Sequence, residues 1–152
     1  MEEIENKSGM NYLKILYRIL IVWAVTLSII SCNSNPEPIE FGKDQCAFCK
    51  MTIVDEKFGS ELITPQGRIL KYDAAECMAQ DIGNDGQEFS ALYAIALDQP
   101  GKLVLVDSLK FVIHESIRSP MGANLGGFIG NVDEKYLDSV MTWPKIVQRL
   151  KK

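Results

Sequence analysis

The distribution of charged and apolar residues divides the first thirty positions into two parts. Lys7, Lys14 and Arg18 precede residues 19–30, a run that carries no charge. A basic start followed by a short apolar stretch predicts a secretory signal peptide over residues 1–31. A membrane-spanning helix fits this run poorly, because it would reach only roughly 18 Å against about 30 Å for the hydrocarbon core of a bilayer.

Short apolar runs separated by turn residues describe a small mixed domain further along the chain. Residues 58–64 and 68–73 are expected to form two strands joined by a turn at Pro65-Gln-Gly67. Residues 74–82 are expected to form a helix, with Asp73 as its N-cap and Gly83 as its end.

The second half of the domain is expected to repeat this order less regularly. The expected strands are 92–97, 103–106, 111–115 and 125–129, and the expected helices are 133–141 and 144–150. Strands and helices mixed in this way predict the α+β class, with a β-β-α-β module followed by a similar but less regular second module. The expected boundaries are 44–101 for the first module and 102–152 for the second.

Charge and size narrow the function classes. The 152 residues carry a net charge of -4, and residues 1–31 contain three basic and three acidic groups, so the chain without them keeps the same net charge. This mild acidity, with no basic stripe, argues against nucleic acid as a partner. About 110 residues beyond position 43 suffice for one small domain or two very small modules.

The end of the apolar run has a pattern of its own. Leu27-Ser-Ile-Ile-Ser-Cys32 resembles the lipobox of bacterial lipoproteins, in which the cysteine receives lipid and becomes the new N-terminus. Several acyl chains hold a protein to a membrane much more firmly than one chain does. The resemblance implies an extracytoplasmic protein anchored at Cys32, followed by a flexible, proline-containing tether over residues 32–43. Asn33 does not match the aspartate of inner-membrane retention, so the periplasmic face of the outer membrane is the expected location.

Three cysteines remain beyond Cys32. The informative stretch is Cys46-Ala-Phe-Cys49-Lys-Met51, in which two thiols and a thioether can converge from one tight turn. Thiolate and thioether together form a soft donor set, which suits Cu(I) and does not suit Mg²⁺ or Ca²⁺. The third cysteine, Cys77, falls in an expected helix and is either a further ligand or a small buried apolar residue.

The same CxxC pair has other candidate roles. An oxidising compartment would favour a structural disulfide between Cys46 and Cys49. A zinc site needs four ligands and would have to recruit Cys77 and His114, the only histidine. With either a disulfide or a zinc ion as a structural cross-link, the protein would be a structural lipoprotein or an interaction module. A thiol–disulfide oxidoreductase is disfavoured because its CxxC opens a helix, whereas the residues after Cys49 turn toward a strand.

Three separated patches occur in an order that points to one family. They are Cys46-Ala-Phe-Cys49-Lys-Met51-Thr, Lys71-Tyr-Asp-Ala-Ala-Glu-Cys77-Met78 and Ser119-Pro-Met121-Gly122. Together with the lipobox they resemble the NosL family, the accessory lipoproteins of nitrous oxide reductase, over residues 44–132. The resemblance implies two small ββαβ modules. It also implies a metallochaperone, not an enzyme, that delivers Cu(I) outside the cytoplasm to nitrous oxide reductase or to another copper-receiving enzyme.

The resemblance also implies which residues bind copper. Cys49 and Met51 match the Cys-x-Met signature of the family, and Cys46 matches a cysteine that many members have before it. Met121 matches the methionine of the Pro-Met-Gly patch, which implies a ligand that reaches the site from the second module. Lys50 occupies a position where the family usually has glycine, so the turn is expected to differ.

Overall fold

The computed structural model describes residues 13–20 and 35–151, and the expected lipidation site Cys32 lies outside the described residues. Residues 13–20 are helical and belong to a different compact unit from the domain, which begins at Asn33. In the described part of the chain, no helix is both long enough and apolar enough to cross a membrane.

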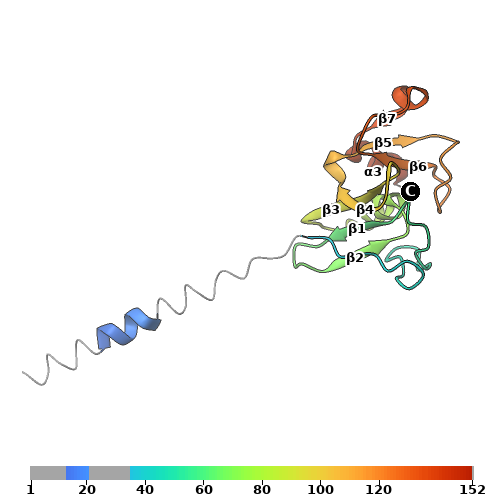
Figure 1. Ribbon diagram of the computed structural model, residues 1–152. Coiled ribbons are helices and arrows are strands. Elements are labelled where there is room, and N and C mark those ends of the chain that lie inside the picture. Colours follow the sequence, from blue (N-terminus) through green and yellow to red (C-terminus); the bar gives the residue numbers. More distant parts are fainter. Residues whose placement is uncertain (1–12, 21–34, 152) are drawn as a thin grey trace, which may run out of the picture. The chain divides into compact units, whose positions relative to one another are not determined.

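The first sheet has four antiparallel strands in the order β2-β1-β3-β4 (Figure 1). They are β1 (Ser60–Ile63), β2 (Ile69–Tyr72), β3 (Ala91–Ala96) and β4 (Gln99–Leu105). The strand predictions for this sheet are confirmed, except that β4 begins at Gln99 instead of Leu103. Ala96 pairs with Gln99, so only two residues form the turn and the expected module boundary at residue 101 falls inside β4.

The helix α2 (Ala75–Gln80) follows β2 and continues as a π-helical segment, η1 (Asp81–Asp85), that runs past the expected end at Gly83. The expected N-cap at Asp73 is wrong, because the N-cap residue is Ala74 and no side chain caps the helix. Asp73 is buried instead, and its backbone N–H donates to the sulfur of Cys46. The contact with the Cys46 segment therefore replaces the local capping interaction.

The second sheet has three antiparallel strands in the order β6-β5-β7. They are β5 (Lys110–Ile113), β6 (Leu125–Phe128) and β7 (Val140–Met141), with the 3-10 helix η2 (Val106–Ser108) before β5. The helix expected at 133–141 is a 3-10 helix, η3 (Glu134–Ser139), that ends in β7, because Val140 and Met141 pair with β5. The last expected helix is confirmed as α3 (Trp143–Leu150), with a proline in its first turn.

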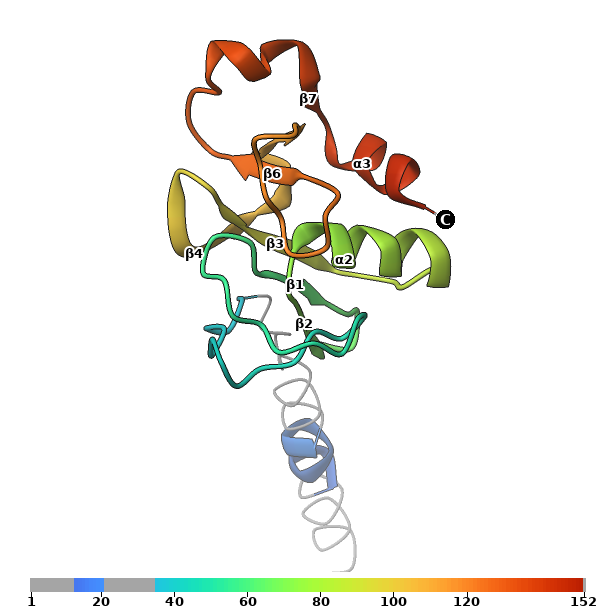
Figure 2. The same cartoon turned by 90° about the vertical axis from the view of Figure 1, so that its right-hand side faces the viewer.

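One hydrophobic core joins the two sheets and both helices. Leu62 of β1, Met78 of α2, Phe111 of β5 and Ile146 of α3 are fully buried in the same cluster. Figure 2 shows α3 lying alongside α2, and the two helices contact each other. The α+β class is therefore confirmed, with the two modules packed as one domain.

The segment that precedes Cys46 is part of this domain. Ile39 belongs to the core, and the backbone N–H of Glu37 donates to the buried carboxylate of Glu61 at 3.0 Å. Lys71 of β2 donates its ammonium group to the carbonyl oxygen of Pro38 at 2.9 Å. The expected tether is therefore attached to the first sheet from Glu37 onward, because Ile39 is an apolar residue that the core takes up.

Candidate metal centre

Cys46 and Cys49 lie on a tight turn that precedes β1. Gln45 and Thr52 pair across this turn as an antiparallel bridge, and the N–H of Cys46 donates to the carbonyl oxygen of Met51 at 2.8 Å. The pair therefore lies in a β-type turn and does not open a helix, as the sequence predicts.

Lys50 completes the turn in an unusual conformation for a residue with a side chain. Its φ is 64°, in the left-handed region that glycine adopts freely and that costs other residues about 1–2 kcal/mol. Its N–H donates to the carbonyl oxygen of Cys46 at 3.0 Å, and its ammonium group donates to the carbonyl oxygen of Ala47. The sequence predicts a different turn here because lysine occupies a position where the family usually has glycine. The backbone of Lys50 nevertheless has a conformation that glycine would favour.

Cys77 completes a cluster of three thiols. It lies in α2, and the Sγ atoms of Cys46, Cys49 and Cys77 all lie within 4.8 Å of one another. Cys46 and Cys77 are buried, whereas Cys49 is partly exposed, and all three are free thiols. Within the described residues, no histidine or carboxylate joins this cluster. Cys77 is therefore both a buried residue of the core and a thiol placed beside Cys46 and Cys49, where it could serve as a third sulfur ligand.

His114 lies in a different set of contacts. Its Nδ1 is 2.9 Å from the hydroxyl oxygen of Ser116, and its ring packs edge-on against Tyr136 with the centroids 5.0 Å apart. The four-ligand zinc site that His114 would complete is therefore not assembled among the described residues.

The surroundings of the three thiols favour one thiolate, at Cys46. The thiol of Cys77 donates to Cys46, and the backbone N–H groups of Asp73 and Cys49 also donate, so the pKa of Cys46 falls to about 5 although burial opposes this. Burial raises the pKa of Cys49. The pKa of Cys77 is raised because its proton is shared with Cys46 and because it is buried. The three thiols therefore share one negative charge near neutral pH.

A thiolate titration tests this assignment. The ultraviolet thiolate absorbance of the reduced, metal-free protein is expected to rise near pH 5 with the amplitude of one thiolate, and to rise again only above the ordinary thiol pKa of about 8.5. Cys46→Ser should remove the step near pH 5, whereas Cys49→Ser should keep it, since the backbone N–H of residue 49 remains. One combined step of three thiolates near pH 8.5 would contradict the assignment.

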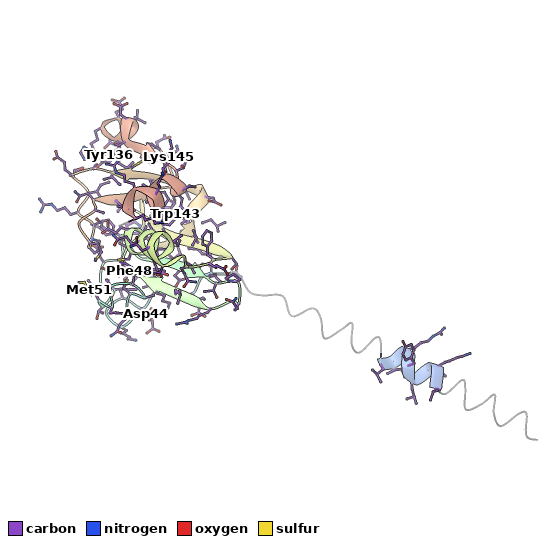
Figure 3. The ribbon with its side chains drawn as sticks, turned by 180° about the vertical axis from the view of Figure 1, so that it is seen from behind. Asp44, Phe48, Met51, Tyr136, Trp143 and Lys145 are labelled. Carbon is purple, nitrogen blue, oxygen red and sulfur yellow. The ribbon has the colours of Figure 1, made fainter. Side chains whose placement is uncertain are left out.

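The two expected methionine ligands are more exposed than the cysteines. Met51 is 55% exposed and points outward from the turn, as Figure 3 shows, while its N–H donates to the sulfur of Cys49. Met121 is 38% exposed and lies in the connection between β5 and β6. Its N–H donates to the carboxylate of Glu76 at 2.7 Å, and Glu76 directly precedes Cys77. Both methionines therefore lie on segments that contact the cysteine cluster or its immediate neighbour.

Glu76 is the residue of this region that sequence reasoning did not single out. It is fully buried in α2, between Ala75 and Cys77. Burial raises its pKa, while hydrogen bonds from Ser119 and from the backbone of Met121 lower it. The available signal was a glutamate inside an otherwise apolar helical turn, which only a distant hydrogen-bonding partner could explain.

The arrangement of sheets and helices is similar to that of a solved protein. The crystal structure of the copper chaperone NosL from Shewanella denitrificans matches 77% of this chain and 98% of its own, with a TM-score of 0.66 and 16% sequence identity. The chain has the NosL fold. The resemblance inferred from the three sequence patches is thus confirmed at the level of the fold. No protein-family model and no curated protein matches the sequence.

On this NosL fold, the cysteine cluster is chemically suited to a soft metal ion. Thiolates bind copper and zinc readily, whereas Mg²⁺ and Ca²⁺ prefer oxygen ligands. Two of the three sulfurs are buried and the third reaches the surface, so an ion held here would be shielded on one side and open on the other.

Proposed function

We propose that the protein is an extracytoplasmic Cu(I) carrier that is held to a bacterial membrane by lipid on Cys32. In this proposal it delivers copper to nitrous oxide reductase or to another copper-receiving enzyme. The observation that carries the proposal is a cluster of three thiols, with sulfurs within 4.8 Å of one another, on the fold of a copper chaperone. Export, the lipid anchor and the recipient are supported by the N-terminal sequence pattern and by the resemblance of the three patches.

The protonation of the cluster favours an ion that needs few thiolates. Cys46 already provides one thiolate, and each further cysteine that coordinates an ion has to lose its proton. Zn²⁺ takes four ligands and would require both Cys49 and Cys77 to be deprotonated, although their pKa values are raised, whereas Cu(I) tolerates two or three ligands and accepts neutral thioethers. Metal binding competes with protons for the sulfurs, so this cost is larger at lower pH.

The graded exposure of the sulfurs fits a carrier. Cys46 and Cys77 would hold the ion from the inside of the domain, and Cys49, Met51 and Met121 would approach it from the surface. Cu(I) tolerates two or three soft ligands, so an incoming donor from a partner can displace the exposed sulfurs one at a time. A closed site with four buried sulfurs would oppose this release.

The test is a metal titration of the soluble form that begins at Asn33. The reduced protein is titrated without oxygen with Cu(I), and separately with Zn²⁺, each against a competing chelator. Tight one-to-one Cu(I) binding and weak zinc binding are expected, and His114→Ala should change neither, because His114 lies outside the cluster. A preference for zinc, or no binding by the reduced protein, would overturn the proposal in favour of a structural lipoprotein.

A further inference from the structure

A buried carboxylate next to the cysteine cluster is bound entirely by one distant loop. Glu76 is fully buried, and burying a carboxylate is costly unless hydrogen bonds compensate it. Its Oε2 accepts a hydrogen bond from the hydroxyl group of Ser119 at 2.9 Å, and its Oε1 accepts one from the N–H of Met121 at 2.7 Å. The N–H of Ala123 is a third donor. All three donors come from residues 119–124, here called the Met121 loop.

The other contacts of the Met121 loop are few. The N–H of Gly122 donates to the carbonyl oxygen of Ser119 at 3.1 Å, and the carbonyl oxygen of Asn124 accepts the N–H of His114 at 3.0 Å. Pro120, Met121 and Gly122 are exposed, and Ser119 is the one buried residue of the loop, itself bound to Glu76. The hydroxyl oxygen of Ser119 also accepts the N–H of Asn124 at 2.8 Å, which closes the loop around the carboxylate. No apolar side chain within residues 119–124 is buried in the core. Apart from these two backbone hydrogen bonds, the conformation of the loop therefore depends on Glu76 and not on apolar packing.

The position of Glu76 in the chain links the loop to the metal centre. Cys77, one of the three clustered thiols, is the next residue along α2. A single helix turn thus carries both a sulfur of the cluster and the group that fixes the loop of Met121. Glu76 itself is not in the cluster, since both of its oxygens are occupied by donors of the Met121 loop.

We propose that Glu76 is a positioning residue that presents the thioether of Met121 to an ion in the cysteine cluster. This inference rests on the proposed Cu(I) site. It adds Glu76 as the residue that holds the Met121 loop of the second module next to that site. Glu76 acts through Met121, so its contribution to metal affinity should vanish once the thioether is gone. A residue that only supports the fold would instead weaken binding whether or not Met121 is present.

A double-mutant cycle separates these two roles. Cu(I) affinity is measured by chelator competition for the wild type, Glu76→Gln, Met121→Ala and the double variant. Glutamine keeps the shape of the side chain but turns an amide NH₂ toward the N–H donors of the loop. Each single substitution is expected to lower the affinity about tenfold or more, as is typical when a residue that orients a metal ligand is changed. The double variant is expected to bind as tightly as Met121→Ala alone.

The matched control is Glu61→Gln. Glu61 is also a fully buried carboxylate, but it accepts its hydrogen bond from the N–H of Glu37, in the segment before Cys46 and not in the Met121 loop. Its substitution is expected to leave the Cu(I) affinity unchanged. If Glu76→Gln prevents folding, Ser119→Ala replaces it in the cycle, because it removes one donor without altering the carboxylate.

Hydrogen exchange of the metal-free protein gives a readout that does not depend on copper. Glu76→Gln should accelerate exchange at the amides of Met121 and Ala123 while the strands keep their protection. Additive losses in the cycle, an unchanged affinity for Glu76→Gln, or faster exchange throughout the domain would each overturn the positioning role. A wild-type protein that binds no Cu(I) would overturn the proposed function, and unchanged exchange at these two amides would separately overturn the link between Glu76 and the loop.

Discussion

Replacing Cys49 and Met51 together by alanine is expected to abolish stoichiometric Cu(I) binding and to leave the domain folded. The two side chains supply one thiol sulfur and one thioether from the same turn, and they are its more exposed sulfur groups. Their loss removes both surface ligands that the turn supplies and leaves the two buried thiols of Cys46 and Cys77, with Met121 as the remaining ligand at the surface. We expect the affinity to fall by about a thousandfold, which corresponds to about 4 kcal/mol.

The fold should tolerate this change because neither side chain is among the buried residues of the core, and only Cys49 packs against it. Substitutions at exposed positions usually alter the free energy of unfolding by about 0.5 kcal/mol or less, and Met51 is 55% exposed. Cu(I) affinity is measured by competition with a chelator, and stability by thermal unfolding of the metal-free protein. Val54→Ala is the matched control, since Val54 is an exposed apolar residue just beyond the same turn. If the double variant still retained one Cu(I), the metal site would lie elsewhere in the protein.

The elements that the sequence predicts correctly are those whose signals are local. The turn at residues 65–67 between β1 and β2, and the apolar residues of α2, are visible within a few positions. The predictions that are wrong concern residues whose conformation is set by contacts with distant parts of the chain. Val140 and Met141 leave the helical pattern because they pair with β5, about thirty residues earlier in the chain. Asp73 is not an N-cap because the Cys46 turn packs on it.

The same distinction explains which parts of the site could be found from the sequence. Cys46, Cys49 and Met51 follow from the spacing of soft donors in one short turn. The role of Cys77 depends on how α2 packs against that turn, so the sequence leaves it open between ligand and core. Glu76 gives no local signal of its partners, because its hydrogen-bonded loop lies more than forty residues later.

Phe111→Ala is expected to cost the domain about 3–5 kcal/mol of its free energy of unfolding. Phe111 is fully buried in β5, the central strand of the second sheet, and its ring lies 5.2 Å from the ring of Trp143 at the start of α3. Its partner in β6 is Gly127, which has no side chain to move into the space that the ring would leave, and its partner in β7 is Met141 at the edge of the sheet. A cavity would therefore remain, and such cavities account for the largest costs of core truncation.

This loss is large because small domains are stable by only about 5–15 kcal/mol. Urea unfolding should show a lower midpoint with an unchanged slope if the two sheets unfold together. Leu137→Ala is the control, because Leu137 is 58% exposed and its truncation should cost about 0.5 kcal/mol or less. The shared core also holds the sheet that carries the Met121 loop against the helix that carries Cys77. If Phe111→Ala cost less than about 1 kcal/mol, or if unfolding split into two transitions, the second sheet would not belong to the same cooperative core. The positions of Met121 and the cysteine cluster would then be free to vary.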